Sequence, residues 1–348
     1  MENTQRYALL PQVLLPWYKK SARALPWRKD TDPYHIWLSE IMLQQTRVET
    51  VRGYYTRFLA TLPRIQDLAV AEEDQLLKLW EGLGYYTRVR NLQKAAQIIV
   101  RDYKGIFPST YPEISALPGI GPYTAGAIAS ICFDLPMAAV DGNVLRVICR
   151  LTEDFSPIDL AKTKKTISRN LEAIYPREAC GEFTQALMEV GAIICIPKNP
   201  HCQCCPAMDF CLAHKNHTET QLPARLPKQE KRFEKRTVFL LESDGKLALE
   251  RKETPGLLEG LWQLPSESGH LTPNQALEYA QALNTNPLDL LQEIHRTHTF
   301  THIRWDMVCY RIHCGHQTKR FIWATPTEVQ KQYAIPTAFR IFLSNLDA

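Results

Sequence analysis

The first two-thirds of the chain carries apolar residues at helical spacing. Apolar positions recur every three to four residues, with charged residues between them, over residues 72–79, 91–100, 144–151 and 163–174. Residues 36–43 and 124–131 are apolar on nearly every side, which indicates helices buried against their neighbours. No stretch in this part alternates as a strand does, so it is predicted to be all helical.

The last third follows a different pattern. Residues 237–242 and 246–250 are strand-like and flank Ser-Asp-Gly at 243–245, which predicts a hairpin. Strands are also predicted at 308–312 and 321–323, and helices at 274–283 and 338–346. This mixture predicts a second, α+β domain over residues 237–348.

A polar stretch, residues 212–236, separates the two patterns. It contains Pro223 and Pro227, and residues 225–236 carry six Lys or Arg against two Glu. We interpret residues 221–236 as a basic interdomain linker. Its basic side chains either contact a phosphate backbone or are only solvated, and the sequence pattern favours neither hypothesis.

Composition adds few constraints. The 348 residues are 45% hydrophobic and 22% charged, which is ordinary for a globular protein with more than one domain. The net charge of +4 permits a polyanionic partner without establishing one. Residues 8–17 faintly resemble a signal peptide, but Pro11 and Pro16 interrupt them, and no run reaches the length of a membrane span.

Cysteine is the most informative residue type. Five of the ten cysteines are scattered among apolar neighbours, which predicts reduced core residues and a reducing, cytoplasmic compartment. Cys195, Cys202, Cys205 and Cys211 form a C-x6-C-x2-C-x5-C run on a turn-rich stretch. Four thiolates so close in sequence suit a metal or an iron–sulfur cluster better than disulfides. Spacing alone allows Cys204 to replace Cys202 or Cys205.

Residues 117–125, L-P-G-I-G-P-Y-T-A, predict two short helices joined by a glycine hairpin. Gly119 and Gly121 permit a tight turn, and Pro122 is favoured in the first turn of the second helix. The amides at that helix start point outward and attract an anion. A phosphate-binding hairpin is therefore preferred to a plain helical corner.

Two carboxyl groups suit bond cleavage. Asp141, in V-D-G-N-V, caps the helix that follows, and a carboxylate held there stays ionised and able to stabilise positive charge. Glu40 lies in the apolar helix 36–43 and, taken alone, points either to solvent or into a cleft. In a cleft, desolvation would raise the pKa of Glu40 and make it a general acid. A protonated carboxyl group beside a charged one is the arrangement that breaks a glycosidic bond.

Further polar and aromatic residues suit entry into a base stack. Gln44 and Thr46 follow the Glu40 helix, and residues 82–90 combine glycines, Leu83, Tyr85 and Arg88. The alternative, an aromatic core with solvated charges, fits Tyr86 better than Tyr85.

Together these motifs resemble the helix-hairpin-helix DNA glycosylases that carry an iron–sulfur cluster, and within them the adenine-excising MutY family. The resemblance spans essentially the whole chain, and its motifs lie at residues 25–28, 37–46, 82–90, 117–127, 140–144 and the cysteine run. It implies a multidomain fold: an all-α helix-hairpin-helix glycosylase region with a [4Fe–4S] loop at 1–220, then an α+β Nudix-like domain. Its six-helix part is residues 25–134, and the N-terminal helix joins 135–220 in the cluster-bearing part.

The resemblance implies excision of adenine flipped from a duplex where it is mispaired with 8-oxoguanine or guanine. Glu40 is then the general acid at adenine N7, Asp141 stabilises the sugar cation and Asn143 supports the polar site. Trp27, Arg28 and Gln185 match adenine-pocket positions. The positions that probe DNA around the lesion match Gln44, Thr46, Leu83, Tyr85, Arg88, Gly119 and Gly121. The family spacing selects Cys195, Cys202, Cys205 and Cys211 as cluster ligands and leaves Cys204 unbound.

Tyr123 distinguishes subclasses. Related endonuclease III enzymes hold a lysine here that forms a Schiff base and drives strand cleavage, which a phenol cannot do. A monofunctional glycosylase is therefore expected. The alternatives are a bifunctional enzyme acting on oxidised pyrimidines, or a non-catalytic iron–sulfur protein that binds lesions, although a mere binder needs neither Glu40 nor Asp141.

The C-terminal domain lacks the glutamate-rich box that a Nudix hydrolase needs to bind metal, so it is expected to recognise DNA lesions. Phe300, Thr301 and His302 match a Phe-Ser-His loop that senses 8-oxoguanine in the family. The alternative makes Phe300 a core strand residue. The expected partner is double-stranded DNA, bound by a monomer acting on bacterial nucleoid DNA.

Overall fold

The computed structural model describes residues 1–227, 230–254 and 256–343. Its contacts divide the chain into two compact units. Unit 1 comprises Met1–Val70 and Arg90–Pro227, and unit 2 comprises Ala71–Val89 and Lys228–Ala348. Unit 2 therefore combines a short segment from the helical part of the sequence with the C-terminal domain. No helix in the described ranges is both long enough and apolar enough to cross a membrane.

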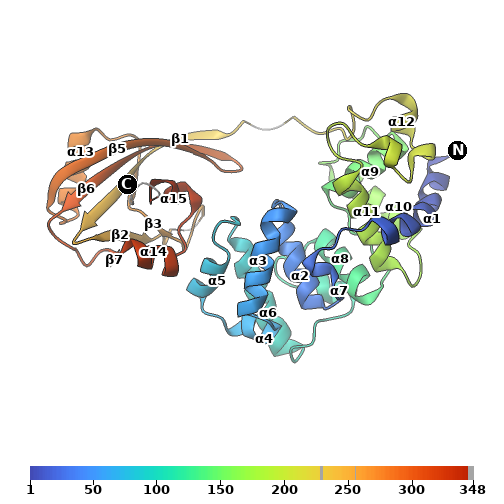
Figure 1. The fold of residues 1–348 in the computed structure, drawn as a ribbon, viewed down its shortest axis with the longest axis horizontal. Coiled ribbons are helices and arrows are strands. Elements are labelled where there is room, and N and C mark those ends of the chain that lie inside the picture. The colour runs from blue at the N-terminus through green and yellow to red at the C-terminus, as the bar shows by residue number, and fades with distance from the viewer. Residues whose placement is uncertain (228–229, 255, 344–348) are drawn as a thin grey trace. The chain divides into compact units, whose positions relative to one another are not determined.

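All regular elements in the described residues of unit 1 are helices, which confirms the prediction for this region (Figure 1). The helices predicted from periodicity at 36–43, 91–100, 124–131, 144–151 and 163–174 all form. Its elements are α1 (Asn3–Ser21), η1 (Pro26–Arg28), α2 (Pro33–Leu43), α3 (Val48–Thr61), α4 (Ile65–Val70), α6 (Thr87–Asp102), α7 (Tyr111–Ser115), α8 (Pro122–Phe133), α9 (Gly142–Thr152), α10 (Ala161–Glu172), α11 (Cys180–Ile193), η2 (Cys202–Cys204), η3 (Met208–Phe210) and α12 (Leu212–Asn216).

The predicted helical hairpin is formed by α7 and α8. Between them, the Ile120 amide donates to the Leu117 carbonyl at 3.2 Å, and Gly119 takes a φ of +78°, which closes a tight turn. Gly121 is the N-cap of α8 and Pro122 follows it, as expected. A Cβ atom added at Gly121 would meet nothing within 4 Å, so the backbone is open to close approach there.

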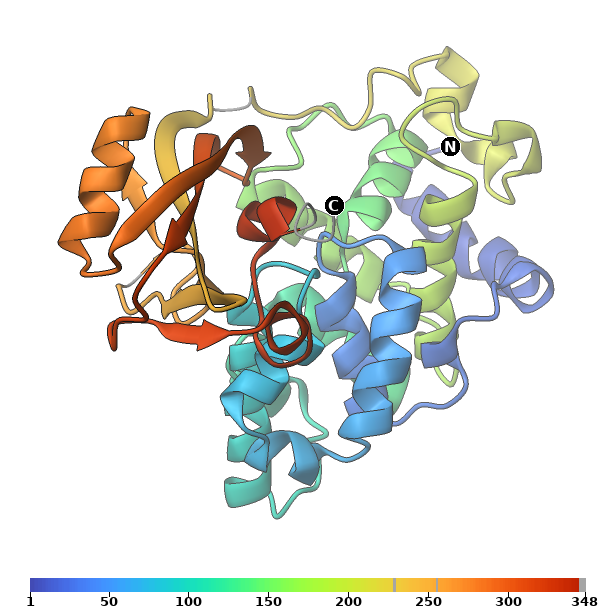
Figure 2. The same cartoon turned by 60° about the vertical axis from the view of Figure 1, so that its left-hand side comes forward.

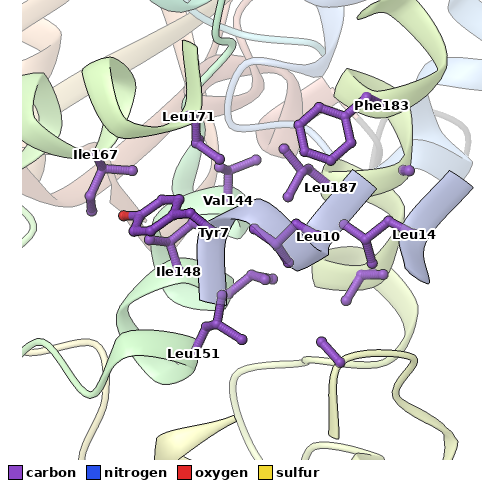
Figure 3. Packing of buried hydrophobic residues seen from close by; sticks show 14 of the residues in the cluster. Tyr7, Leu10, Leu14, Val144, Ile148, Leu151, Ile167, Leu171, Phe183 and Leu187 are labelled. Atoms are coloured by element: carbon purple, nitrogen blue, oxygen red, sulfur yellow. The ribbon is translucent and has the colours of Figure 1, made fainter. Parts of the chain in front are cut away.

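The core of unit 1 joins the start of the chain to residues far along it. Tyr7, Leu10 and Leu14 of α1 point toward Val144, Ile148 and Leu151 of α9 and toward Phe183 and Leu187 of α11 (Figure 3). Leu10 and Leu14 are fully buried. The N-terminal helix is thus an integral part of the layer that carries the cysteine run.

Unit 2 is built on a mixed sheet with strand order β3-β2-β1-β6-β5, in which β4 pairs with β1 and β7 pairs with β2. The long strands β1 and β6 run parallel, and the other pairs are antiparallel. The elements are α5 (Glu73–Leu79), β1 (Arg232–Ser243), β2 (Lys246–Arg251), β3 (Trp262–Gln263), β4 (Ser266–Ser268), α13 (Pro273–Ala282), β5 (Pro287–Thr299), β6 (Ile303–Cys314), β7 (Ile322–Ala324), α14 (Pro326–Gln332) and α15 (Thr337–Leu343).

Alternate residues of the central strands bury the two faces of this sheet. Val238 and Leu240 belong to a core with α14 and α15, whereas Phe239 and Leu241 belong to a core with α13. Figure 2 shows the helices on opposite sides of the strands. The period of two along β1 is the feature that allows both faces to be covered.

Most elements predicted in the last third are confirmed, but β1 is longer than predicted, and β3, β4, β5 and α14 were not predicted. The hairpin forms, with Glu242 opposite Leu247 and positive φ at Asp244 and Gly245. However, β1 begins at Arg232 rather than at 237, because the basic residues pair with β6. Strand β5 was not predicted, since both of its faces are largely exposed and its apolar signal is weak. The end of the predicted helix 338–346 lies outside the described residues.

Candidate active site and cysteine loop

A cavity of about 630 Å³ in unit 1 collects many of the residues singled out from the sequence. It lies between the η1–α2 segment, the start of α8, the start of α9 and the middle of α11. Its volume falls in the range of about 300–1,000 Å³ that is usual for a small-ligand site. The residues among its lining that the sequence singled out are Trp27, Arg28, Glu40, Gln44, Thr46, Gly121, Tyr123, Asp141, Asn143 and Gln185.

Glu40 is buried rather than turned to solvent. It is 6% exposed on the buried helix α2, and the Tyr123 hydroxyl donates to its Oε2 at 2.5 Å. Burial raises the pKa of Glu40 to about 7; the Tyr123 hydrogen bond opposes this rise, and the charge of Asp141 adds to it. Near neutral pH the carboxyl group is therefore divided between its acidic and basic forms.

Asp141 is fixed by the helix that it caps. Its Oδ1 accepts from the Val144 amide at 2.7 Å, and its Oδ2 accepts from Asn143 Nδ2 at 2.9 Å. Burial raises the pKa of Asp141, while these hydrogen bonds and the charge of Arg146 oppose the rise. The predicted cap is present, but the carboxylate depends on three neighbours to offset its desolvation.

Glu189 is a part of the cavity wall that the sequence motifs did not reveal. Its side chain is fully buried on α11 and accepts from Arg23 Nε at 2.7 Å and from Arg28 Nη2 at 2.8 Å. Burial alone would raise the pKa of Glu189, but the hydrogen bonds from both arginines lower it to about 2. Arg28 is thus held in place, with its guanidinium 5.6 Å from the ring centre of Tyr18.

Gln185 is oriented by a neighbour on α1. The Tyr18 hydroxyl donates to its Oε1 at 2.8 Å, which leaves the amide nitrogen to act as a donor. The Gln185 side chain lines the same cavity as Trp27, whose ring packs edge-to-face on Tyr55 at 5.5 Å.

Arg146, also not singled out from the sequence, connects the cavity with the cysteine run. Its Nη2 donates to Asn143 Oδ1 at 2.9 Å and to the Gly191 carbonyl at 2.7 Å, and its Nε donates to the Cys195 carbonyl at 2.7 Å. A Cβ atom at Gly191 would lie 2.6 Å from that of Asn143, so only glycine permits this close approach of α9 and α11.

The cysteine run surrounds one small cavity. Cys195, Cys202, Cys205 and Cys211 all line it, whereas Cys204 is exposed and lines the outer surface. All ten cysteines are free. Burial raises the pKa of Cys202 to about 11, and Glu219 and the thiols of Cys195 and Cys211 add to the rise. Sulfurs that repel one another as thiolates fit a site for a bound cation.

Arg150 holds the loop that follows Cys195. It is 2% exposed, and its Nη1 lies 3.4 Å from Cys195 Sγ. It also donates to the carbonyls of Ile196, Pro197 and Leu222 at 2.8–3.1 Å. Arg146 and Arg150 are one turn apart on an otherwise apolar helix face, and this spacing was the sequence signal that could have revealed both.

Some residues expected to contact DNA do not line this cavity. Gly119 is in the α7–α8 turn of unit 1. In unit 2, Leu83 and Arg88 are buried, while Tyr85 is 45% exposed, takes a φ of +48° and forms a hydrogen bond with the Thr301 hydroxyl.

The turn that holds Phe300, Thr301 and His302 joins β5 to β6. The Phe300 amide donates to the Ile303 carbonyl at 2.8 Å, and this turn leaves Thr301 and His302 exposed at its tip. The Phe300 ring packs edge-to-face on Trp305 at 4.8 Å and is half-buried. Phe300 therefore combines a core contact with a place beside an exposed tip.

Family models match both parts of the chain. The HhH-GPD superfamily of base excision DNA repair proteins matches residues 38–177, and a NUDIX domain matches residues 237–345. The fold thus defines a helix-hairpin-helix DNA glycosylase with a Nudix-like domain. A thermostable thymine-DNA glycosylase is 28% identical, with a TM-score of 0.56, over 61% of this chain and 98% of that chain. A trapped endonuclease III–DNA intermediate, 23% identical with a TM-score of 0.53, shares the helical fold over 63% of this chain and 99% of that chain.

Curated relatives are more specific. Adenine DNA glycosylase of Buchnera aphidicola is 37% identical over 84% of this chain and 82% of its own length. The human adenine DNA glycosylase is 33% identical over 88% of this chain and 67% of its own length. The chain belongs to the adenine DNA glycosylase family and is a DNA glycosylase of base-excision repair.

Proposed function

We propose that this enzyme excises adenine mispaired with 8-oxoguanine, and also with guanine, by hydrolysing the N-glycosidic bond in the unit 1 cavity. The observation that carries the proposal is the burial of Glu40 beside Tyr123, which raises its pKa to about 7, in the cavity that also holds Asp141. A partly protonated carboxyl group, together with a second one whose oxygens are held by a helix start and by Asn143, is what a dissociative glycosidic cleavage needs.

The proposed reaction has two proton-balanced stages. Glu40 donates its proton to adenine N7 as the bond between the sugar and the base breaks, and the base leaves with the bonding electron pair. The positive charge left on the sugar is stabilised by the Asp141 carboxylate. Water then adds to the sugar carbon and gives up its proton to the Glu40 carboxylate, which restores the acid, and an abasic site remains. Asn143 keeps Asp141 oriented through its 2.9 Å hydrogen bond.

The pocket for the flipped base would be formed by Trp27, Arg28 and Gln185. Trp27 offers a flat apolar surface for the purine ring, and Arg28 and Gln185 offer polar groups to its edge. The ion pair of Glu189 with Arg28, and the hydrogen bond from Tyr18 to Gln185, support this role because they fix both side chains before substrate binds.

We further propose a monofunctional glycosylase. Tyr123 lines the cavity at the position in question, and its phenol offers no amine for a Schiff base. Burial raises the pKa of Tyr123 well above 10, so it remains a neutral donor to Glu40. A borohydride-trapped enzyme–DNA adduct formed through a residue of this cavity, together with efficient nicking, would contradict the assignment.

DNA recognition would involve both units. In the α7–α8 hairpin, Gly119 with its positive φ closes the turn, and Gly121 presents open backbone to a phosphate. Gln44 and Thr46 would probe the stack beside the cavity. In unit 2, Leu83, Tyr85 and Arg88 would form the wedge, and the Phe300–Thr301–His302 tip would sense 8-oxoguanine. The enzyme would act as a monomer on double-stranded DNA of the nucleoid.

The four cysteines that line one cavity would hold a [4Fe–4S] cluster, which supplies a structural cross-link for the loop. Among the described residues, three ligand atoms lie within 4.8 Å of one another only in Cys202, His214 and Glu219. The four cysteines line one cavity at the spacing that the family uses for its iron–sulfur cluster, and this favours the cluster over zinc. Cys202→Ser should lose the cluster's visible absorbance and Cys204→Ser should keep it; the reverse result would reject this ligand set.

The test of function is a glycosylase assay on duplexes carrying adenine opposite 8-oxoguanine, adenine opposite guanine, or thymine glycol. Abasic sites are scored as strand breaks before and after alkali. We expect breaks only after alkali and only on the two adenine duplexes, faster opposite 8-oxoguanine. Nicking of thymine glycol duplexes without alkali would identify the bifunctional alternative instead.

A further inference from the structure

Unit 2 contains a polar clamp, formed by Lys78 and Glu81, between α5 and the connection that joins α14 to α15. Lys78 Nζ donates to the Tyr333 carbonyl at 2.9 Å and to Glu81 Oε2 at 2.7 Å. The other oxygen, Glu81 Oε1, accepts from the Ile335 amide at 3.0 Å. Lys78 and Glu81 are more than 250 positions away from Tyr333 and Ile335 in the sequence. Their two side chains nevertheless bind the backbone of the α14–α15 connection at two places.

The clamp is shielded from solvent. The side chains of Lys78 and Glu81 are 22% and 14% exposed, and Ala334 and Ile335 are each 2% exposed. Backbone groups in such a place need partners, because an unpaired buried amide or carbonyl is costly. A second contact, from Arg251 to Glu73 and Asp74 at 3.2 and 3.4 Å, is more exposed and therefore contributes less.

Several hydrogen bonds hold the loop that follows the clamp. Trp80 is fully buried and its Nε1 donates to the Gly84 carbonyl at 3.1 Å. Arg88 donates to the carbonyls of Leu83 and Gly84 at 3.0 and 3.1 Å. The hydrogen bonds of this loop therefore connect the place of Glu81 with that of Tyr85. Tyr85 in turn forms a hydrogen bond with the Thr301 hydroxyl.

We propose that Lys78 and Glu81 are positioning residues for lesion recognition: they hold the Leu83–Tyr85 wedge in register with the Thr301 tip, so that the two read the base opposite adenine as one rigid element. The proposal rests on the proposed function, because it assigns both loops to that recognition. Neither residue touches the unit 1 cavity, so the chemical step should not depend on them.

The test compares Glu81→Ala, Glu81→Gln and Lys78→Met in the full-length protein. Single-turnover excision of adenine opposite 8-oxoguanine and opposite guanine is measured at saturating and subsaturating enzyme. For Glu81→Ala and Lys78→Met we expect the 8-oxoguanine preference at subsaturating enzyme to fall about tenfold, as loss of a charged hydrogen bond allows. The rate at saturation should stay within about twofold. Glu81→Gln keeps an acceptor for the Ile335 amide and should restore most of the preference.

A matched control and a structural readout accompany the assay. Glu72 lies at the start of the same helix, and its exposed carboxylate makes no capping hydrogen bond. Glu72→Ala should therefore change neither the 8-oxoguanine preference nor the rate at saturation. Hydrogen exchange of the peptide containing Tyr333 and Ile335 should become faster in Glu81→Ala but not in Glu72→Ala.

The outcomes separate two kinds of failure. If the wild-type enzyme shows no preference for 8-oxoguanine, the proposed function fails. If the wild type shows the preference and both Glu81→Ala and Lys78→Met retain it, the clamp is not a positioning device and this inference is overturned. Should Glu81→Ala not fold, Lys78→Met and Glu81→Gln carry the comparison, since each leaves one half of the contact intact.

Discussion

The cavity around Glu40 and the loop tips around Tyr85 and Thr301 place their polar groups in opposite environments. In the cavity, Glu40 is 6% exposed, and Asp141 is bound by the start of a helix. At the tips, Tyr85 is 45% exposed and Thr301 lies on the surface. Proton transfer gains from a dry environment that shifts a pKa, whereas a surface that inspects DNA must remain open until the duplex arrives. The difference predicts large effects in the first region and small ones in the second.

The largest effect is expected at Glu40. Glu40→Gln keeps the shape of the side chain but removes the proton that adenine N7 must receive, so excision should fall about 10²–10⁴-fold. DNA binding, measured by fluorescence anisotropy, should survive. Glu49→Gln on α3, with an 80% exposed side chain, is the control and should leave excision unchanged. Unaltered excision by Glu40→Gln would remove the general acid from the proposal.

The pH dependence should expose the same group. Because burial raises the pKa of Glu40 to about 7, the protonated, active form dominates below that pH and is lost above it. We expect kcat/KM for adenine excision to decline about tenfold per pH unit on the alkaline side. A profile that stays flat from pH 6 to about pH 9 would show that no group with this pKa donates the proton.

Next in size is the buried ion pair behind the cavity. Glu189→Gln leaves Arg23 and Arg28 without their carboxylate partner, and breaking such a buried pair typically costs about 3–5 kcal/mol of stability. The free energy of unfolding in urea measures the loss. Glu182→Gln is matched to it on the same helix, but its contact with Lys19 is largely exposed and should contribute below about 1 kcal/mol. Equal losses in the two variants would mean that burial does not set the strength of the Glu189 contact.

The smallest effect is expected at the tip of the β5–β6 turn. Thr301→Val removes the hydroxyl that Tyr85 binds, and the preference for 8-oxoguanine over guanine should fall about fivefold, the worth of one neutral hydrogen bond. Excision opposite guanine should not change. Thr301→Ser keeps the hydroxyl and is the control; a loss as large as that of Thr301→Val would point to the methyl group instead.

Periodicity predicted α2, α6, α8, α9 and α10 because their buried faces dominate their sequences, but it did not predict α3 or α11. It also predicted the strands whose two sides pack on helices. It missed β5, since exposed residues cover both of its sides, and it placed the start of β1 too late, because charged residues join the ladder with β6. Pairing with a strand distant in sequence can decide how long a strand is, and such pairing leaves no pattern in the local sequence.

The candidate site shows the same division. Glu40, Tyr123 and Asp141 were singled out because each lies in a local motif, and the cavity brings their side chains together. Whether Glu40 faced solvent was undecidable from the helix alone, since α2 is apolar on every side. Glu189 and the Lys78–Glu81 clamp owe their roles to partners distant in sequence, and no local spacing encodes such a contact. Arg146 also has a distant partner, although its spacing from Arg150 on an apolar helix face marks it as unusual.

The position of α1 in the core of unit 1 has a consequence for synthesis of the chain on the ribosome. Leu10 and Leu14 emerge before α9 and α11, and the apolar surfaces that cover them are complete only when Ile193 has been made. At about 5–20 residues per second, α1 therefore waits for roughly 10–35 s with its apolar face unsatisfied. During that interval the nascent α1 segment keeps an uncovered apolar face, and slowing translation between α1 and α11 should increase misfolding of the whole helical unit.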